Sequence, residues 1–131
     1  MDVLQLIEEA YLAREMSYAP YSDFHVGAAL LCKDGTIYRG CNIENAAYSP
    51  TNCAERTAFF KAVSEGQRRF CAIAIVGDKE EYLPPCGVCR QVMAEFCDPE
   101  SFTVILVKNK KEYQELLLKD LFPGAFSGKN L

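Results

Sequence analysis

Residues 70–76 read Phe-Cys-Ala-Ile-Ala-Ile-Val, a stretch without one charged side chain. Continuous apolar runs of this kind are typical of strands that are covered on both faces, whereas strands with one face in water alternate apolar and polar residues. A second such run, Phe-Thr-Val-Ile-Leu-Val, occupies residues 102–107. The two runs predict strands of a sheet that helices cover on both sides.

The segments around these two strands supply the helices and further strands. Asp2 and Gln5 are expected to form a capping pair before an apolar pattern with helical spacing, and Asp34-Gly35 is a hairpin turn between two short strands. We expect helices at residues 2–17, 52–64 and 86–96, strands at 24–32 and 36–41, and a final short helix at 112–121. This order predicts an α/β fold with three layers, α/β/α, around a mixed sheet of about five strands, in a single domain of residues 1–131.

The composition is that of an ordinary globular protein and argues against two classes of partner. The chain has 131 residues and a net charge of −4. An acidic protein is poorly suited to duplex nucleic acid, which binds clustered Lys and Arg. No apolar run approaches the roughly 18 residues of a membrane span, and the first residues lack the features of a secretory signal. We expect no nucleic-acid or membrane partner and a cytoplasmic location. There, seven cysteines favour metal or catalytic thiols over a disulfide framework.

Three of the cysteines have the spacing of a metal site. Cys86 and Cys89 lie three positions apart, so one helix can direct both sulfurs at a single ion. Cys53 stands at the start of the preceding helix, where the partial positive charge of a helix N-terminus stabilises a thiolate. Structural zinc sites have four protein ligands, whereas catalytic sites have three and leave the fourth position to water. The three cysteines therefore predict a catalytic Zn²⁺ site.

Two residues next to Cys53 have the properties that such a site needs. Glu55 points in a different direction from Cys53 on its helix, which places a carboxylate beside the ion rather than on it. That carboxylate can accept a proton from the water and transfer it to a substrate. Three thiolates leave one excess negative charge on Zn²⁺, and Arg56 is positioned to donate hydrogen bonds that offset this charge.

Each of these features also has a simpler interpretation. Residues 52–55 resemble a capping box, in which Glu55 only closes the helix end. A single Cys-x-x-Cys pair also occurs in redox sites and structural zinc sites, and Cys41 would be the fourth ligand of a closed site. His25, the only histidine, is expected not to bind metal. The remaining thiols are expected to be buried and structural: Cys32, Cys41, Cys71 and Cys97.

Several further motifs together resemble one family. A ligand-x-Glu pair followed by Pro-Cys-x-x-Cys is the zinc motif of nucleobase deaminases, and this chain has Cys53 as the first ligand. The motifs are 18–22 (Tyr-Ala-Pro-Tyr-Ser), 24–29 (Phe-His-Val-Gly-Ala-Ala), 40–48 (Gly-Cys-Asn-Ile-Glu-Asn-Ala-Ala-Tyr), 53–56 (Cys-Ala-Glu-Arg), 85–91 (Pro-Cys-Gly-Val-Cys-Arg-Gln) and 121–126 (Leu-Phe-Pro-Gly-Ala-Phe). In this order they closely resemble the small homotetrameric cytidine deaminases, and the resemblance covers nearly the whole chain.

The resemblance implies roles for residues outside the zinc motif. Asn42 and Glu44 would hydrogen-bond the ribose of a nucleoside, with Glu44 at its 3′-hydroxyl. Phe24 would flank the face of the pyrimidine, and Phe126 would stack on it from a neighbouring subunit. Tyr48 and the backbone of Ala54 would line the rest of the pocket.

The activity that the resemblance implies is hydrolytic deamination of cytidine and 2′-deoxycytidine to uridine and 2′-deoxyuridine, with release of ammonia, in pyrimidine salvage. One Zn²⁺ per subunit would activate the water, Glu55 would shuttle protons, and Arg56 would be the compensating arginine of the family. The expected partners are the nucleoside and three further copies of the chain, with pockets shared between subunits. Three other functions stay open: deamination of a related cytosine nucleoside such as blasticidin S, editing of polynucleotide cytosines, which conflicts with the acidic balance, and a non-catalytic zinc-stabilised interaction domain.

Overall fold

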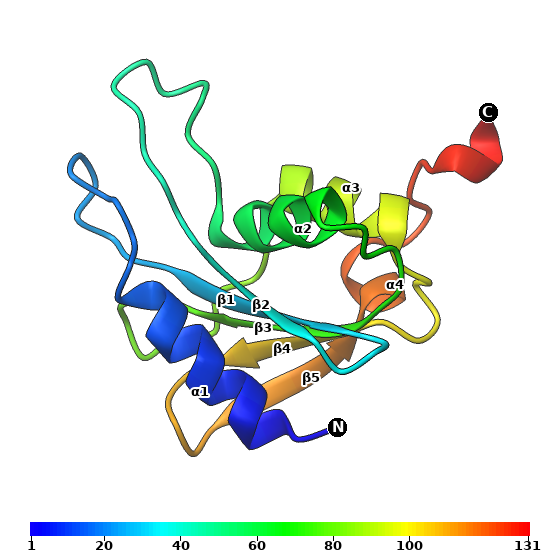
Figure 1. Cartoon of the computed structure of the whole chain (residues 1–131), viewed down its shortest axis with the longest axis horizontal. Helices are drawn as coiled ribbons and strands as arrows, with labels where there is room; N and C mark the ends of the chain where they lie inside the picture. The colour runs from blue at the N-terminus through cyan, green and yellow to red at the C-terminus, as the bar shows by residue number, and fades with distance from the viewer.

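The computed structural model describes residues 1–131 and contains one five-stranded sheet between helices (Figure 1). In chain order the elements are α1 (Val3–Arg14), β1 (Gly27–Cys32), β2 (Ile37–Cys41), α2 (Ala54–Ser64), β3 (Phe70–Val76), α3 (Gly87–Phe96), β4 (Thr103–Val107), β5 (Tyr113–Leu117), α4 (Leu118–Leu121) and a 3₁₀ turn (Gly128–Asn130). The strand order is β2-β1-β3-β4-β5, in which β3 and β4 are parallel and all other neighbours antiparallel. The predicted mixed sheet of five strands is confirmed.

None of the helices combines the length and the apolar character that a membrane span requires.

Helices cover the sheet on both faces, as the apolar strands predict. Figure 1 shows α1 on one side of the sheet and α2 and α3 on the other. The strand β3 contributes side chains to both cores: Ile73 and Ile75 belong to the core under α2 and α3, whereas Ala72 and Ala74 belong to the core under α1. All four are fully buried. The stretch 70–76 therefore forms a central strand that is buried on both faces.

Two glycines let the helices lie very close to the sheet. A Cβ atom at Gly27 would lie 2.1 Å from the Ala10 carbonyl oxygen, and one at Gly40 would lie 2.3 Å from the Ala54 carbonyl oxygen. No larger residue fits at these positions without moving α1 or α2. The close contact at Gly40 fixes the first turn of α2, and with it Cys53, against the end of β2.

Two loops that are far apart in the sequence lie side by side at one end of the sheet. They are residues 15–26, between α1 and β1, and residues 42–53, between β2 and α2 (Figure 1). Backbone hydrogen bonds join them, from Tyr18 N to Asn42 O (3.0 Å) and from Glu44 N to Tyr18 O (2.8 Å). The two loops thus form one structure next to the start of α2.

Two predicted elements differ from the structure by three residues at one end. The first helix ends at Arg14 rather than at residue 17, because the chain turns there toward the 42–53 loop. Asp2 does cap this helix by accepting a hydrogen bond from Gln5 N at 3.0 Å. The first strand begins at Gly27 rather than at residue 24, because Phe24 O and Val26 N bond to the side chain of Asn42, and His25 N to the side chain of Asp78, instead of to a neighbouring strand.

The predicted helix at residues 112–121 is wrong for most of its length. Residues 113–117 form β5, which pairs antiparallel with β4 from Val107↔Tyr113 to Thr103↔Leu117, and only Leu118–Leu121 are helical. A tight turn precedes β5, in which Asn109 Oδ1 accepts hydrogen bonds from the backbone of Lys111 (2.8 Å) and Glu112 (2.9 Å). Pairing with the outer edge of β4, which has no other partner strand, outweighs the local helical pattern.

Candidate active site

The helices α2 and α3 both begin directly after a cysteine. Cys53 is the N-cap of α2 and Cys86 is the N-cap of α3, each with an extended backbone and without a hydrogen bond from its side chain to the helix. The expectation that these cysteines lie inside the first turn is therefore wrong by one residue. As N-caps their side chains are free to turn toward a common point, at which the two helix N-termini also supply partial positive charge.

The sulfurs of Cys53, Cys86 and Cys89 come together in one cluster. All three lie within 4.8 Å of one another, and Cys53 Sγ and Cys86 Sγ are 3.9 Å apart. A tetrahedral zinc ion with bonds of about 2.3 Å to sulfur holds its sulfurs about 3.8 Å apart. Neither Cys41 nor His25 belongs to the cluster, which offers three protein ligands rather than four.

The surroundings of the cluster favour the thiolate form of Cys53. A hydrogen bond from the Cys89 thiol, together with the Arg56 guanidinium, lowers the pKa of the Cys53 thiol to about 5. The same hydrogen bond and burial raise the pKa of Cys89, so this pair shares one proton. A cation among the sulfurs takes the place of such a proton, because metal binding requires thiolates.

Arg56 lies against the cluster as its position in the sequence predicts. Its Nη2 donates a hydrogen bond to Cys53 Sγ at 3.2 Å, and its Nε is buried without any partner in the chain. A half-buried cationic group beside these sulfurs fits a cluster that carries excess negative charge. The donor set of three thiols, their separation and the adjacent arginine all fit Zn²⁺, and Zn²⁺ is the cofactor of this chain.

Glu55 is the one charged side chain that the fold buries, with 5% of its surface exposed. Burial, assisted by the charge of Cys53, raises the pKa of its carboxyl to about 7, against the opposing effect of Cys89 and Arg56. These neighbours show that the carboxyl lies beside the cluster. A carboxyl with such a pKa can both accept and donate a proton near neutral pH. The simpler interpretation as a capping box has no support, because no side chain caps α2.

Asn42 and Glu44, predicted to bind ribose, have structural hydrogen bonds that the sequence did not reveal. Asn42 Oδ1 accepts from Val26 N (2.9 Å) and Asn42 Nδ2 donates to Phe24 O (2.8 Å). Glu44 accepts from the backbone of Tyr21 at 2.9 Å and from the backbone and hydroxyl of Ser22. The two side chains thus hold the 15–26 loop, and keep one amide N–H of Asn42 and further lone pairs of Glu44 for a ligand.

The remaining predicted pocket residues lie in different environments. Tyr48 is strongly exposed with a positive φ of 63°, and with Glu44 it lines a hollow of about 410 Å³. Ala54 is fully buried at the first position of α2. The Phe126 side chain is 58% exposed, while its carbonyl oxygen accepts a hydrogen bond from Gln91 Nε2 at 2.9 Å. Tyr48 therefore projects from the 42–53 loop next to Glu44. The backbone of Phe126 is held in place, while its ring is exposed.

Arg90 is a site neighbour that the sequence analysis did not identify. Its Nε donates to Pro85 O and its Nη1 donates to Leu121 O, both at 2.8 Å. It therefore ties the residue before Cys86 to the segment that leads to Phe126. The only sequence signal for this role is its place directly after Cys89.

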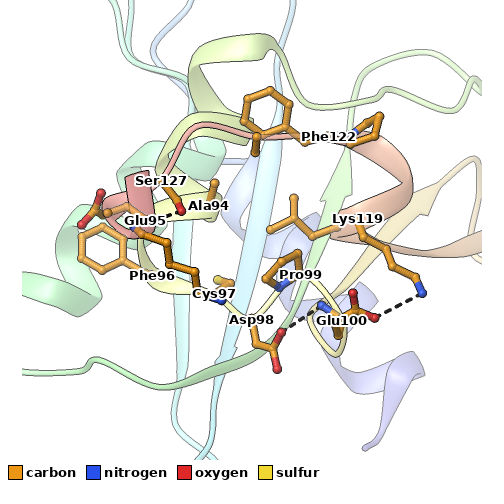
Figure 2. A pocket seen from close by; sticks show the side chains of 16 residues that line it. Ala94, Glu95, Phe96, Cys97, Asp98, Pro99, Glu100, Lys119, Phe122 and Ser127 are labelled. Carbon is orange, nitrogen blue, oxygen red and sulfur yellow. Dashed lines mark hydrogen bonds and ion pairs between the residues drawn. The ribbon is translucent and has the colours of Figure 1, made fainter. Parts of the chain in front are cut away.

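A large cavity lies away from the cysteine cluster. It measures about 710 Å³ and is lined by the C-terminal end of α3, the following loop, α4 and the C-terminal tail (Figure 2). Figure 2 shows Phe96, Pro99 and Phe122 around it and Lys119 bonded to Glu100 at its rim. None of the predicted site residues lines it. Because α3 separates it from Cys86, it is not part of the active site.

Comparison with known proteins agrees with this geometry over the whole chain. Residues 2–105 match the model of the cytidine and deoxycytidylate deaminase zinc-binding region. A cytidine deaminase of Sporosarcina psychrophila is 60% identical over all of this chain and 96% of its own length, and one of Halalkalibacterium halodurans is 56% identical over all of this chain and 98% of its length. The crystal structure of a cytidine deaminase from Burkholderia pseudomallei has a TM-score of 0.91 and 48% identity, over 96% of this chain and all of that one. The chain therefore belongs to the cytidine deaminase family, and it is a zinc-dependent hydrolytic deaminase.

Proposed function

We propose that this chain converts cytidine and 2′-deoxycytidine, with one water molecule, to uridine and 2′-deoxyuridine and ammonia. The observation that carries this proposal is the buried Glu55 beside a cluster of three cysteine sulfurs at two helix N-termini. A closed structural zinc site would have four ligands and no use for a buried carboxyl. Relatives named cytidine deaminase, at 60% and 56% identity, support the choice of substrate.

Each residue of the cluster has a separate task in this proposal. Cys53, Cys86 and Cys89 hold the zinc ion, which when bound acts as a Lewis acid that acidifies water at neutral pH. Glu55 accepts one proton of the water and delivers it to N3 of the pyrimidine, and it then transfers the second proton, from the hydroxyl added at C4, to the departing amine. Arg56 offsets the excess charge of the three thiolates through its bond to Cys53. The pKa of about 7 suits Glu55 to both directions of proton transfer.

The two loops orient the nucleoside above this cluster. Asn42 and Glu44 bond the ribose with the amide N–H and the lone pairs that their structural bonds leave free. Phe24 flanks the pyrimidine face, because Asn42 holds its backbone at the site. Tyr48 and the backbone of Ala54 complete the pocket. Such fixed orientation of substrate and reacting group contributes a large part of catalysis.

Phe126 takes part from a neighbouring subunit in a homotetramer. Its exposed ring and its anchored backbone support this role, because Gln91 holds the tail in place while the ring stays available to another chain. The nucleoside, rather than nucleic acid or membrane, is then the partner besides the copies of the chain. Each subunit works as one domain of residues 1–131 with one zinc ion, in pyrimidine salvage in the cytoplasm.

The proposal is tested by following cytidine loss by ultraviolet absorbance. Cytidine, 2′-deoxycytidine, blasticidin S and a single-stranded oligonucleotide are compared at equal concentration, with and without a zinc chelator. We expect turnover of both nucleosides, its loss with chelator and its return on addition of Zn²⁺. A preference for blasticidin S or for the oligonucleotide would contradict the assigned substrate, and no turnover of any of them would contradict the catalytic role.

A further inference from the structure

Phe24 and His25 both contact the loop that follows β3, at Gly77 and Asp78. This loop runs from the end of β3 to Cys86 at the start of α3, so it joins the wall of the proposed base pocket to a metal-binding cysteine. Neither Gly77 nor Asp78 has a part in the proposed chemistry. Gly77 lies against the aromatic ring at residue 24, and Asp78 bonds to the residue next to it.

Gly77 lies directly against the ring of Phe24. A Cβ atom at residue 77 would lie 3.1 Å from Phe24 Cζ, 3.4 Å from Phe24 Cε1 and 3.2 Å from Leu83 Cδ2. Carbon atoms in ordinary contact are about 3.5–4.0 Å apart, so a methyl group here would displace its neighbours by a few tenths of an ångström. The φ of Gly77 is not in the left-handed region, so alanine at this position adds contact without backbone strain.

Hydrogen bonds to Arg14 and His25 keep the loop from moving away from the Phe24 ring. Arg14 Nη1 donates a hydrogen bond to the Gly77 carbonyl oxygen at 2.7 Å. Asp78 Oδ2 accepts two hydrogen bonds from His25, from the backbone N at 2.6 Å and from Nδ1 at 2.7 Å. Gly77 is buried, whereas Phe24 is only half-buried. A larger residue 77 would therefore move the Phe24 ring toward its open side.

We infer that Gly77 and Asp78 are positioning residues, which set the place of the Phe24 ring and thereby the width of the slot for the pyrimidine. The inference rests on the proposed function, in which Phe24 flanks the base. Gly77 leaves room for the ring to stand back from the base, and Asp78 fixes the backbone of His25 next to it. Both act on the substrate through Phe24.

The inference is tested by a double-mutant cycle of Gly77→Ala and Phe24→Leu, in which leucine lacks the ring atoms nearest residue 77. In the parent enzyme Gly77→Ala should raise KM for cytidine about three- to tenfold and change kcat less than about twofold, as a change of binding does. In the Phe24→Leu background it should change KM less than about twofold, because the two substitutions share one contact. If Gly77→Ala raised KM by the same factor in both backgrounds, the inference would be overturned.

Two variants of Asp78 test the other contact. Asp78→Asn keeps an oxygen that can accept both hydrogen bonds from His25, whereas Asp78→Ala keeps none. We expect Asp78→Ala to raise KM about threefold or more, and Asp78→Asn to keep KM within about twofold of the parent. If the two variants raised KM equally, the charge of Asp78 rather than its hydrogen bonds would matter, which contradicts the positioning role.

A matched control separates these effects from the general consequences of substitution. Gly128 also has a φ outside the left-handed region, and a Cβ atom there meets nothing within 4 Å, so Gly128→Ala should leave KM unchanged. Turnover of cytidine by the parent enzyme tests the proposed function separately. An inactive parent enzyme would refute that function and this inference with it. An active parent whose KM is unaffected by Gly77→Ala would refute the inference alone, because the contact would then be ordinary packing.

Discussion

The active site has two halves that the fold holds in different ways. The cysteine half consists of residues 53–56 and 86–89, at the starts of α2 and α3. Each stretch of four residues places two or three functional groups. The loop half consists of residues 15–26 and 42–48, which are held by hydrogen bonds between positions 16 to 25 residues apart. The cysteine half is built within rigid helices, the loop half between irregular segments.

In the proposed function, this difference separates the residues that bind the nucleoside from those that carry the chemistry. The cysteine half keeps its carboxyl and one of its sulfurs buried: Glu55 is 5% exposed and Cys89 1%, while Cys53 is half-buried and Cys86 is exposed. The loop half is open, with Tyr48 77% exposed. Changes in the cysteine half should therefore affect zinc content and kcat, whereas changes in the loop half should affect KM and leave zinc in place. Four substitutions test this division.

The largest effect is expected from Cys89→Ala. Loss of one of three ligands should abolish zinc binding at working concentrations and reduce deamination to background. Zinc per chain, measured by elemental analysis of the purified protein, checks this. Cys97→Ala is the control, because Cys97 is also buried and caps the other end of the same helix. Full zinc content in Cys89→Ala would remove this residue from the ligand set.

Glu55→Gln should have the next largest effect and should leave the metal in place. Glutamine is similar in size but cannot carry a proton, so kcat should fall by about 10²–10⁴-fold, with zinc per chain unchanged. Steady-state kinetics and elemental analysis on one preparation check both parts. Glu65→Gln, at the exposed end of the same helix, should behave as the parent does. Parent-like turnover by Glu55→Gln would contradict the proton-shuttle role.

Arg56→Ala should weaken the cysteine half without dismantling it. Loss of the hydrogen bond to Cys53 leaves the negative charge of the three thiolates uncompensated, and such outer contacts change metal affinity or activity by about 10–100-fold. Competition with a chromogenic zinc chelator measures the affinity. Arg68→Ala removes a guanidinium that bonds carbonyl groups at the far end of α2, and should leave zinc affinity unchanged. If Arg56→Ala had the zinc affinity and the activity of the parent enzyme, charge compensation by Arg56 would be excluded.

The same division explains which features the sequence predicts. The strand β3 and the three cysteines follow from patterns of at most seven consecutive residues, and the structure has β3 at its predicted bounds and the three sulfurs in one cluster. Local spacing suffices there, because a helix start fixes its own geometry. The strand β5 was missed, since its pairing with β4 depends on a contact outside the local sequence.

The contacts within the loop half cannot be predicted from local sequence patterns. That Asn42 ties down Phe24 and Val26, and that Gly77 bounds the Phe24 ring, depends on the packing of segments that meet only in the folded chain. Resemblance to a family names such residues but does not supply these contacts. The strand predicted from residue 24 began three residues too early for the same reason, because the side chain of Asn42 replaces a strand partner.

Asn42→Ala is therefore the sharpest test of the division, and it should have the smallest effect of the four on the chemical step. Loss of the Asn42 side chain leaves Val26 N and Phe24 O without their partners. KM for cytidine should therefore rise about tenfold, and the free energy of unfolding should fall by about 1–3 kcal/mol. Zinc per chain should not change. Asn109→Ala removes comparable backbone contacts in the turn before β5, and should lower stability without changing KM. If Asn42→Ala lost zinc, or if both variants changed KM equally, the two halves would not be independent, and the loops would support the metal-binding cysteines as well as the nucleoside.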